Sequence, residues 1–129
     1  MYLISKEDRS LKGEINISGS KSESNRLLII RAYTSFFKII NLSDSDDTNT
    51  LISALESNDE KINIGHAGTA MRFLTSYFSS TQNSSKILTG SERMKERPIS
   101  ILVDALRELE VEISYIKNEG YPPIKIRGK

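Results

Sequence analysis

The sequence predicts an α/β (or α+β) fold, in which helices cover a β-sheet. Two observations carry this prediction. Short apolar runs typical of strands alternate with longer segments of helical periodicity, and glycine or cationic residues recur where a strand run gives way to a helix. The 129 residues suffice for one domain with a core but not for two of ordinary size. No segment has the length and apolar character of a membrane span or a signal peptide.

The first predicted strand covers residues 11–18, where apolar residues and glycine alternate with polar residues over a period of two. A helix is expected directly after it. Ser20 and Glu23 match the Ser-x-x-Glu capping box, and the apolar positions that follow continue to about Tyr33. The segment GSKSESNR (residues 19–26) therefore lies on a predicted strand-to-helix turn.

Further strands and helices are predicted along the rest of the chain. Bounded apolar runs predict strands over residues 37–42, 61–64, 86–89, 111–116 and 124–127. Helices are predicted after the acidic turn at 43–47, ending near Glu56; after the glycine turn at 65–69, reaching Phe78; and after the charged turn at 90–97, ending near Leu109. Pro98 suits the first position of the last helix because its missing N–H costs nothing there. The predicted order is roughly ββαβαβαβαββ.

Charge and composition exclude several classes of function. The 18 basic and 17 acidic residues leave a net charge of +1, so no overall field attracts nucleic acid or anionic lipid. The chain has no cysteine and a single histidine, His66, which excludes disulfides, a thiolate nucleophile and a multi-histidine metal site. We therefore expect no metal, no cofactor, and no nucleic-acid or membrane partner. A cytoplasmic location fits this composition.

Three strand-to-helix turns could bind an anion, and they lie at residues 19–26, 65–72 and 90–97. The free N–H groups and the positive dipole end at a helix start attract anions, and glycine allows a ligand to approach the backbone closely. The compensating charges would come from Lys21, Arg26, Arg72 and Arg97. The recurrence predicts a local site for an anion such as a phosphate.

Each turn also has a simpler interpretation. Ser20 can cap its helix while the neighbouring cations face solvent, and for this turn taken alone the simpler interpretation is favoured. The turn at 65–69 can be a tight turn capped by Thr69, with His66 as a polar turn residue. Residues 93–98 can form a solvated charged loop. Only the repetition of glycine, cation and helix start favours a binding function.

Two familiar motifs do not match. A nucleotide P-loop needs Gly-x-x-x-x-Gly-Lys-Ser/Thr, whereas Gly13 and Gly19 are one residue too far apart and Ser20 precedes the lysine. The acidic residues at 44–47 lack the later glutamate of a calcium-binding loop. We therefore interpret these acids as turn and cap residues.

Five segments together resemble one enzyme family. They are GSKSESNR (19–26), NLSDSDDT (41–48), GHAGTAMR (65–72), LTGSERMKERPI (88–99) and YPP (121–123). The family they resemble is 5-enolpyruvylshikimate-3-phosphate synthase (EPSP synthase, or 3-phosphoshikimate 1-carboxyvinyltransferase), and they follow its order across nearly the whole chain. The related UDP-N-acetylglucosamine enolpyruvyl transferases are less similar, because they lack the Ser-x-Ser-Asn-Arg continuation and usually carry a loop cysteine.

The resemblance implies transfer of the enolpyruvyl group of phosphoenolpyruvate to the 5-hydroxyl of shikimate 3-phosphate, with release of phosphate, in aromatic amino-acid biosynthesis. By the same resemblance, Lys21 would contact both substrates. Ser22 and Arg26 match positions that hold shikimate 3-phosphate, and Gly68 and Arg97 match positions that contact phosphoenolpyruvate. Supporting roles are implied for His66, Thr69, Arg72 and Arg93. The proton-transfer residues of the family lie in a portion that this chain does not contain.

The resemblance also implies two domains of the inverse α/β barrel type, built from repeated βαβαββ units, of which this chain holds only a partial domain. Residues 1–18 would be first strands belonging with an otherwise absent C-terminal domain, and residues 19–129 an incomplete N-terminal substrate-binding domain. Family members are roughly three times as long, so the 129 residues are expected to be inactive alone and the full-length protein to be a monomer. The chain departs from the family at His66, where many members have asparagine, and at Phe73, where many have proline.

Two other functions are compatible with parts of this sequence. A stand-alone phosphate-ligand binding module of the same fold would keep the anion-binding turns without the chemistry. A structural or interaction protein would leave three cationic glycine turns unexplained. The enolpyruvyl transferase is therefore the favoured hypothesis, and the binding module is the alternative.

Overall fold

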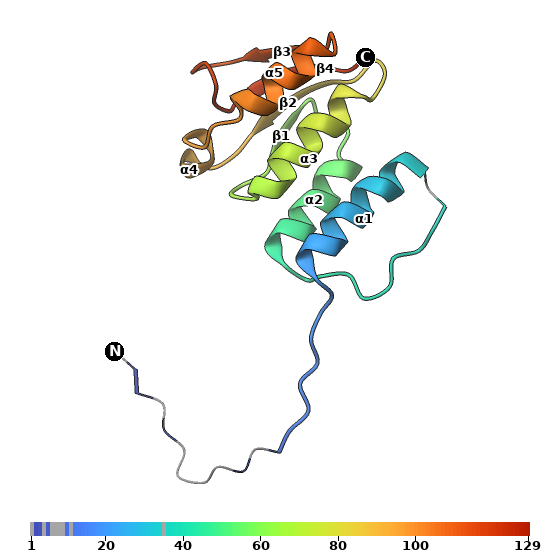
Figure 1. Ribbon diagram of the computed structural model, residues 1–129, viewed down its shortest axis with the longest axis vertical. Helices are drawn as coiled ribbons and strands as arrows, with labels where there is room; N and C mark the ends of the chain where they lie inside the picture. Colours follow the sequence, from blue (N-terminus) through green and yellow to red (C-terminus); the bar gives the residue numbers. More distant parts are fainter. Residues whose placement is uncertain (1, 4, 6–9, 11, 35) are drawn as a thin grey trace.

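The computed structural model describes residues 2–3, 5, 10, 12–34 and 36–129. Its helices are α1 (Lys21–Thr34), α2 (Asp46–Glu56), α3 (Gly68–Ser79), α4 (Glu92–Lys95) and α5 (Ser100–Glu108) (Figure 1). Its strands are β1 (Lys61–Asn63), β2 (Ser85–Thr89), β3 (Glu112–Tyr115) and β4 (Ile124–Arg127). No helix within these ranges is long and apolar enough to cross a membrane.

The four strands form one sheet in the order β1-β2-β4-β3. Strands β1 and β2 are parallel, whereas β4 pairs antiparallel with both β2 and β3. Parallel neighbours need a crossover connection, and α3 provides it. Because α5 follows β2 and leads to the β3–β4 pair, the segment from β1 to β4 is a βαβαββ unit with the short α4 inserted. The predicted α/β fold class and its repeat unit are thereby confirmed.

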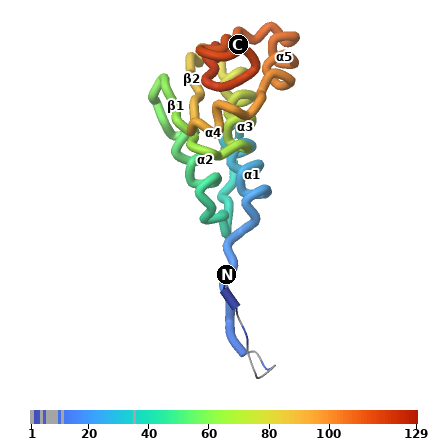
Figure 2. The backbone as a smooth tube through the Cα atoms, turned by 90° about the vertical axis from the view of Figure 1, so that its left-hand side faces the viewer, coloured from blue at the N-terminus to red at the C-terminus, as the bar shows by residue number. Residues whose placement is uncertain are grey.

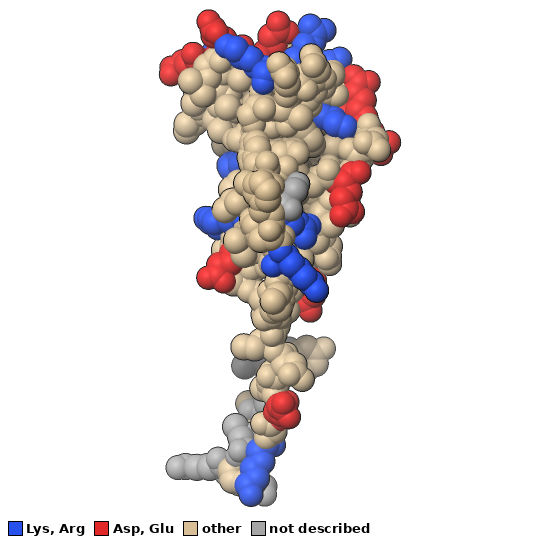
Figure 3. Space-filling model, turned by 90° about the vertical axis from the view of Figure 1, so that its right-hand side faces the viewer, with Lys and Arg blue, Asp and Glu red and all other residues tan. Residues whose placement is uncertain are grey.

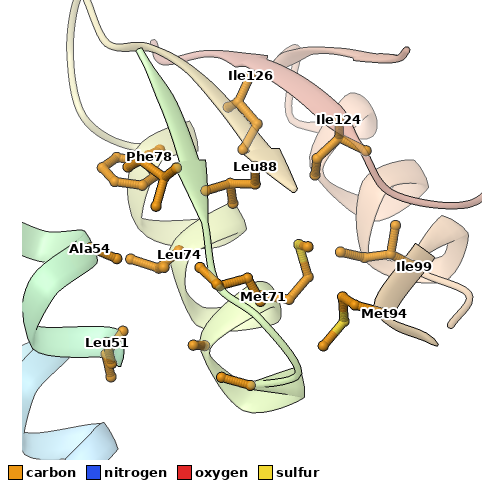
Figure 4. Close-up of a cluster of buried hydrophobic side chains, with 14 of the residues drawn as sticks. Leu51, Ala54, Met71, Leu74, Phe78, Leu88, Met94, Ile99, Ile124 and Ile126 are labelled. Atoms are coloured by element: carbon orange, nitrogen blue, oxygen red, sulfur yellow. The ribbon is translucent and has the colours of Figure 1, made fainter. Parts of the chain in front are cut away.

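One face of the sheet is apolar and is covered by helices α3 and α5 (Figure 1). Ile62, Leu88 and Ile124 are neighbours across three strands, and each is at most 5% exposed. They belong to one buried cluster with Met71 and Leu74 of α3 (Figure 4). The opposite face carries Lys61, Asn63, Ser114, Lys125 and Arg127. This alternation is typical of a sheet with one buried face and one solvated face.

Helices α1 and α2 lie side by side, next to α3 (Figures 1 and 2). Leu28 of α1 and Leu51 of α2 are buried between them and the rest of the core. A fully buried hydrogen bond also joins the two helices, because the Thr48 hydroxyl donates to Asn25 Oδ1 at 2.8 Å. The start of α1 is thus fixed relative to α2 and α3.

Two predicted strands are wrong for the residues that the structure describes. Residues 12–18 form no strand and extend away from the helices (Figure 2), with Ile15 86% and Ile17 84% exposed; Leu11 lies outside the described residues. Residues 37–42 also form no strand, and Ile40 is 83% exposed. A strand needs a neighbour to satisfy its backbone groups, and neither segment has one among the described residues. The observed order is therefore ααβαβααββ.

The charged turn at 90–97 contains a helix that the sequence did not predict. Residues 92–95 form α4, capped by the Ser91 hydroxyl, which accepts from the Met94 N–H at 3.3 Å, and anchored by the buried Met94 side chain. The prediction that Pro98 occupies the first position of α5 is wrong, because the helix begins at Ser100. The Ile99 N–H donates to the Gly120 carbonyl at 2.9 Å, and this contact holds the backbone at Ile99 outside the helical region.

Candidate anion-binding site

The connections that follow β1 and β2 meet at one edge of the sheet, because carboxyl ends of parallel strands lie at the same edge. The Ser91 N–H donates to the Gly65 carbonyl at 2.9 Å. A Cβ atom added to Gly90 would lie 2.5 Å from that same carbonyl oxygen, so position 90 must be glycine for the two loops to approach. This contact brings the start of α3 next to the segment that carries Arg97.

The Arg97 guanidinium lies directly over the first residue of α3. A Cβ atom added to Gly68 would lie 2.3 Å from Arg97 Nη1 and 2.7 Å from its Cζ, so the guanidinium occupies the space that a side chain would need. Helix α3 begins without a side-chain cap, and the first N–H groups of a helix have no partner within it. A cation above such N–H groups is a favourable arrangement for an anion.

The cations of α1 extend the site toward α3. Arg26 donates through Nη1 to the Ser22 carbonyl at 2.8 Å, and its Cζ atom lies 5.8 Å from the centroid of the Phe73 ring on α3. Lys21 Nζ lies 3.5 Å from Asp47 Oδ2, and the Lys21 side chain is 50% exposed. The starts of α1 and α3 therefore present their cations to a shared space.

These groups line a pocket of about 330 Å³. Its lining residues are Lys21, Ser22, Asn25, Arg26, Gly68, Thr69, Arg72, Phe73 and Arg97. Four of them are cations and none is a carboxylate, so the pocket is suited to an anionic ligand. On the face shown in Figure 3, in contrast, lysine and arginine are interspersed with acidic side chains.

The pocket brings together seven of the nine residues that the sequence singled out. The two others lie elsewhere: His66 is exposed and lines a different cavity, and Arg93 is exposed on α4. Two lining residues were missed as site residues. Asn25 has no charge to mark it, although it directly precedes Arg26, and Phe73 was noted as a departure from the proline of many family members, not as a site residue.

The cavity that His66 lines is larger, at about 660 Å³, and runs along α2 and β1. Its charged lining residues include Asp46, Asp47 and Asp59 but only one lysine, Lys61, so it is poorly suited to an anion. Within the described ranges, no three acidic or histidine side chains gather as a metal-binding group. Ser45, which directly precedes Asp46, caps α2, because its hydroxyl accepts from the Thr48 N–H at 3.4 Å. The smaller pocket is therefore the candidate site.

Comparison with known proteins identifies the family. The family model described as EPSP synthase (3-phosphoshikimate 1-carboxyvinyltransferase) matches residues 50–129. The chain belongs to the EPSP synthase family. A 3-phosphoshikimate 1-carboxyvinyltransferase of Bacteroides fragilis is 52% identical over 129 residues, covering 99% of this chain and 31% of that protein. One from Colwellia psychrerythraea is 42% identical over 146 residues, covering 92% of this chain and 34% of that protein.

The solved structures give the same result for the fold. An EPSP synthase from Acinetobacter baumannii superimposes with a TM-score of 0.74 at 20% identity, over 91% of this chain and 32% of that one. A second structure of the Acinetobacter baumannii EPSP synthase gives a TM-score of 0.71 over 90% of this chain. The chain thus has the fold of part of an EPSP synthase, and it spans about a third of the length of the curated relatives it matches.

Proposed function

We propose that the full-length protein transfers the enolpyruvyl group of phosphoenolpyruvate to the 5-hydroxyl of shikimate 3-phosphate and releases phosphate. Family membership supports the reaction, and one observation in this chain supports it most directly. The pocket at the starts of α1 and α3 has four cations and no carboxylate among its lining residues. Both proposed substrates are phosphorylated anions, which such a pocket is suited to bind. A cytoplasmic location and a monomeric state are part of this proposal.

The proposal assigns the pocket residues to the two substrates. Lys21 would lie between them, with Ser22 and Arg26 toward shikimate 3-phosphate. Gly68 and Arg97 would face phosphoenolpyruvate, and their closeness in the structure supports assigning both to one substrate. Supporting roles are proposed for His66, Thr69, Arg72 and Arg93, although His66 and Arg93 would act from outside the pocket lining.

In the proposed mechanism, this part of the protein binds and orients the substrates. The 5-hydroxyl of shikimate 3-phosphate adds to C2 of phosphoenolpyruvate and loses its proton to a base while C3 is protonated; the tetrahedral intermediate then loses phosphate from C2 and a proton from C3, which restores the double bond. Fixed cations offset the repulsion between two anionic substrates and hold the hydroxyl near C2, which is the positioning contribution to catalysis. No carboxylate lines the pocket, so we propose that the proton-transfer groups belong to the rest of the full-length protein.

The exposure of the site supports a second wall supplied by the remaining polypeptide. Lys21 is half exposed, and Arg26 and Arg97 are exposed as well. A pocket open on this side holds charged ligands in contact with water, where electrostatic interactions are weak. We therefore propose that residues 19–129 form half of the substrate site and that residues 1–18 belong with the domain that closes over it.

The proposal is tested by steady-state kinetics on the full-length protein, with phosphate release as the readout. Release should require both substrates. Arg97→Ala should raise KM for phosphoenolpyruvate by at least about tenfold, because a charge-assisted contact contributes about 1.5–3 kcal/mol. Arg127→Ala, which removes an exposed arginine on the outer face of the sheet, is the matched control. Phosphate release in the absence of shikimate 3-phosphate would contradict the proposal, as would equal effects of the two arginine variants on KM for phosphoenolpyruvate. Binding of the substrates without turnover would favour the stand-alone binding module.

A further inference from the structure

Phe73 lies on the pocket side of α3 instead of in the core. The core positions of this helix are Met71, Leu74 and Phe78, which are at most 4% exposed and follow the i, i+3, i+7 spacing of a buried stripe. Phe73 falls beside that stripe and is only half-buried. Its ring lines the anion pocket, and the Arg26 guanidinium of α1 lies over it at 5.8 Å.

The ring contact of Arg26 differs from the contacts of Lys21 and Arg72, although Arg26 also donates to one backbone carbonyl, that of Ser22. Lys21 lies near a carboxylate, that of Asp47, at 3.5 Å. Arg72 donates to two backbone carbonyls, those of Gly68 at 3.3 Å and Pro98 at 3.1 Å. The Asp47 carboxylate offsets the positive charge of Lys21, and the two carbonyls accept N–H groups of Arg72. Each of these contacts therefore competes with an anionic ligand, either for the charge of the cation or for its N–H donors.

An aromatic ring holds an arginine without this competition. It attracts the face of the guanidinium through its quadrupole, and the N–H donors lie in the guanidinium plane, where they can still reach a phosphate or carboxylate. The backbone contact to Ser22 fixes one nitrogen of Arg26 from its own helix, and the Phe73 ring restrains the guanidinium from α3. Together they hold the cation while leaving its charge unneutralised.

We propose that Phe73 is a positioning residue for shikimate 3-phosphate, acting through the Arg26 guanidinium. This inference rests on the proposed function, since it assigns Arg26 to that substrate. Loss of a cation–π contact of this exposed kind corresponds to about two- to fivefold weaker binding. The loss should fall on one substrate only, because Phe73 contacts no other cation of the pocket among the described interactions.

The test compares Phe73→Leu and Phe73→Tyr in the full-length protein by steady-state kinetics. Leucine keeps an apolar side chain but has no aromatic face, so KM for shikimate 3-phosphate should rise about two- to fivefold, with KM for phosphoenolpyruvate unchanged. Tyrosine keeps the face and should behave as the wild type. In an Arg26→Gln background, Phe73→Leu should have no further effect. Tyr115→Leu removes a separate arginine–aromatic contact, at 5.1 Å on β3, and serves as the control for general effects.

Three results would overturn the inference: an unchanged KM in Phe73→Leu, an equal rise for both substrates, or the same rise in the Arg26→Gln background. The contact itself has an independent readout in the NMR resonance of the Arg26 Nε–H, which the ring should shift upfield and Phe73→Leu should restore. A wild-type protein without shikimate-3-phosphate-dependent turnover would refute the proposed function, while an absent ring shift would refute the role of Phe73 separately.

Discussion

Gly68→Ala isolates the contact between the start of α3 and Arg97. The added Cβ atom would lie 2.3 Å from Arg97 Nη1 and 2.7 Å from Cζ, whereas ordinary contacts are about 3.5–4.0 Å. The guanidinium must therefore retreat by about 1 Å or more. A displacement of that size at a substrate-positioning group can reduce turnover by about 100-fold. We expect kcat/KM for phosphoenolpyruvate to fall by one to two orders of magnitude, which is roughly 1.4–2.7 kcal/mol of transition-state stabilisation.

The fold should tolerate this substitution. Gly68 is not among the residues with positive φ, and alanine is favoured over glycine inside a helix by about 1 kcal/mol, with a smaller gain expected in the first turn. The thermal unfolding midpoint of the full-length protein should therefore stay the same or rise. Kinetics with each substrate varied in turn, together with thermal unfolding, make the measurement.

Ser76→Ala is the matched control for Gly68→Ala, because it also introduces alanine into α3 but lies about two turns along the helix from Gly68. It should change neither KM. Two results would refute the reasoning: an unchanged kcat/KM for phosphoenolpyruvate in Gly68→Ala, or a lowered unfolding midpoint with equal losses in kcat/KM for both substrates. The second result would mean that the alanine disturbs the helix instead of the guanidinium.

Four further outcomes are expected. Arg26→Ala should mainly weaken the binding of shikimate 3-phosphate, measured as a raised KM for that substrate. An equal rise in KM for both substrates would contradict the assignment of Arg26. Thr48→Val should lower the free energy of unfolding by about 1–3 kcal/mol in chemical denaturation, because it leaves the buried Asn25 oxygen without its donor; a change below about 0.5 kcal/mol would contradict this. Burial raises the pKa of Tyr115 above 10.0, so its stabilising contribution is complete below that pH and lost as pH rises through the folded value. When the pH is raised from 7 to 11, the free energy of unfolding measured by chemical denaturation should therefore fall less in Tyr115→Phe than in the wild type. Equal falls in the two proteins would refute this. In the full-length protein, the amides of residues 12–18 should exchange slowly with deuterium, whereas rapid exchange would contradict strand pairing with the remaining polypeptide.

The elements that could be predicted from the sequence are those with local determinants. The Ser20 hydroxyl accepts from the Glu23 N–H at 3.4 Å at the start of α1, as the capping-box pattern indicates. Strands β1, β3 and β4 fall within their predicted ranges and β2 begins one residue before its range, because the partners of all four lie in the same βαβαββ unit. The short α4 was missed because its determinant is the burial of Met94, which depends on how the surrounding loops fold.

The site could be predicted only as a set of separate cationic turns. A cation next to a helix start is visible in the sequence, so Lys21, Arg26, Arg72 and Arg97 could be singled out. Their convergence depends on the parallel pairing of β1 with β2 and on the packing of α1 near α3, which no local pattern encodes. Phe73 could not be assigned to the pocket, because one residue of helix rotation decides whether an apolar side chain faces the core or the ligand.

We propose one physical explanation for the failed strand prediction at residues 12–18 and for the open pocket. The alternating pattern of residues 12–18 encodes a surface that is half-buried, yet Ile15 and Ile17 are more than four-fifths exposed. The pocket likewise concentrates cations on a side left open to water. The relatives are about three times as long, and the neighbour of both places would belong to the remaining polypeptide. We propose that strand formation at residues 12–18 and closure of the pocket both depend on the remaining polypeptide of the full-length protein, and rapid exchange of the 12–18 amides there would contradict this.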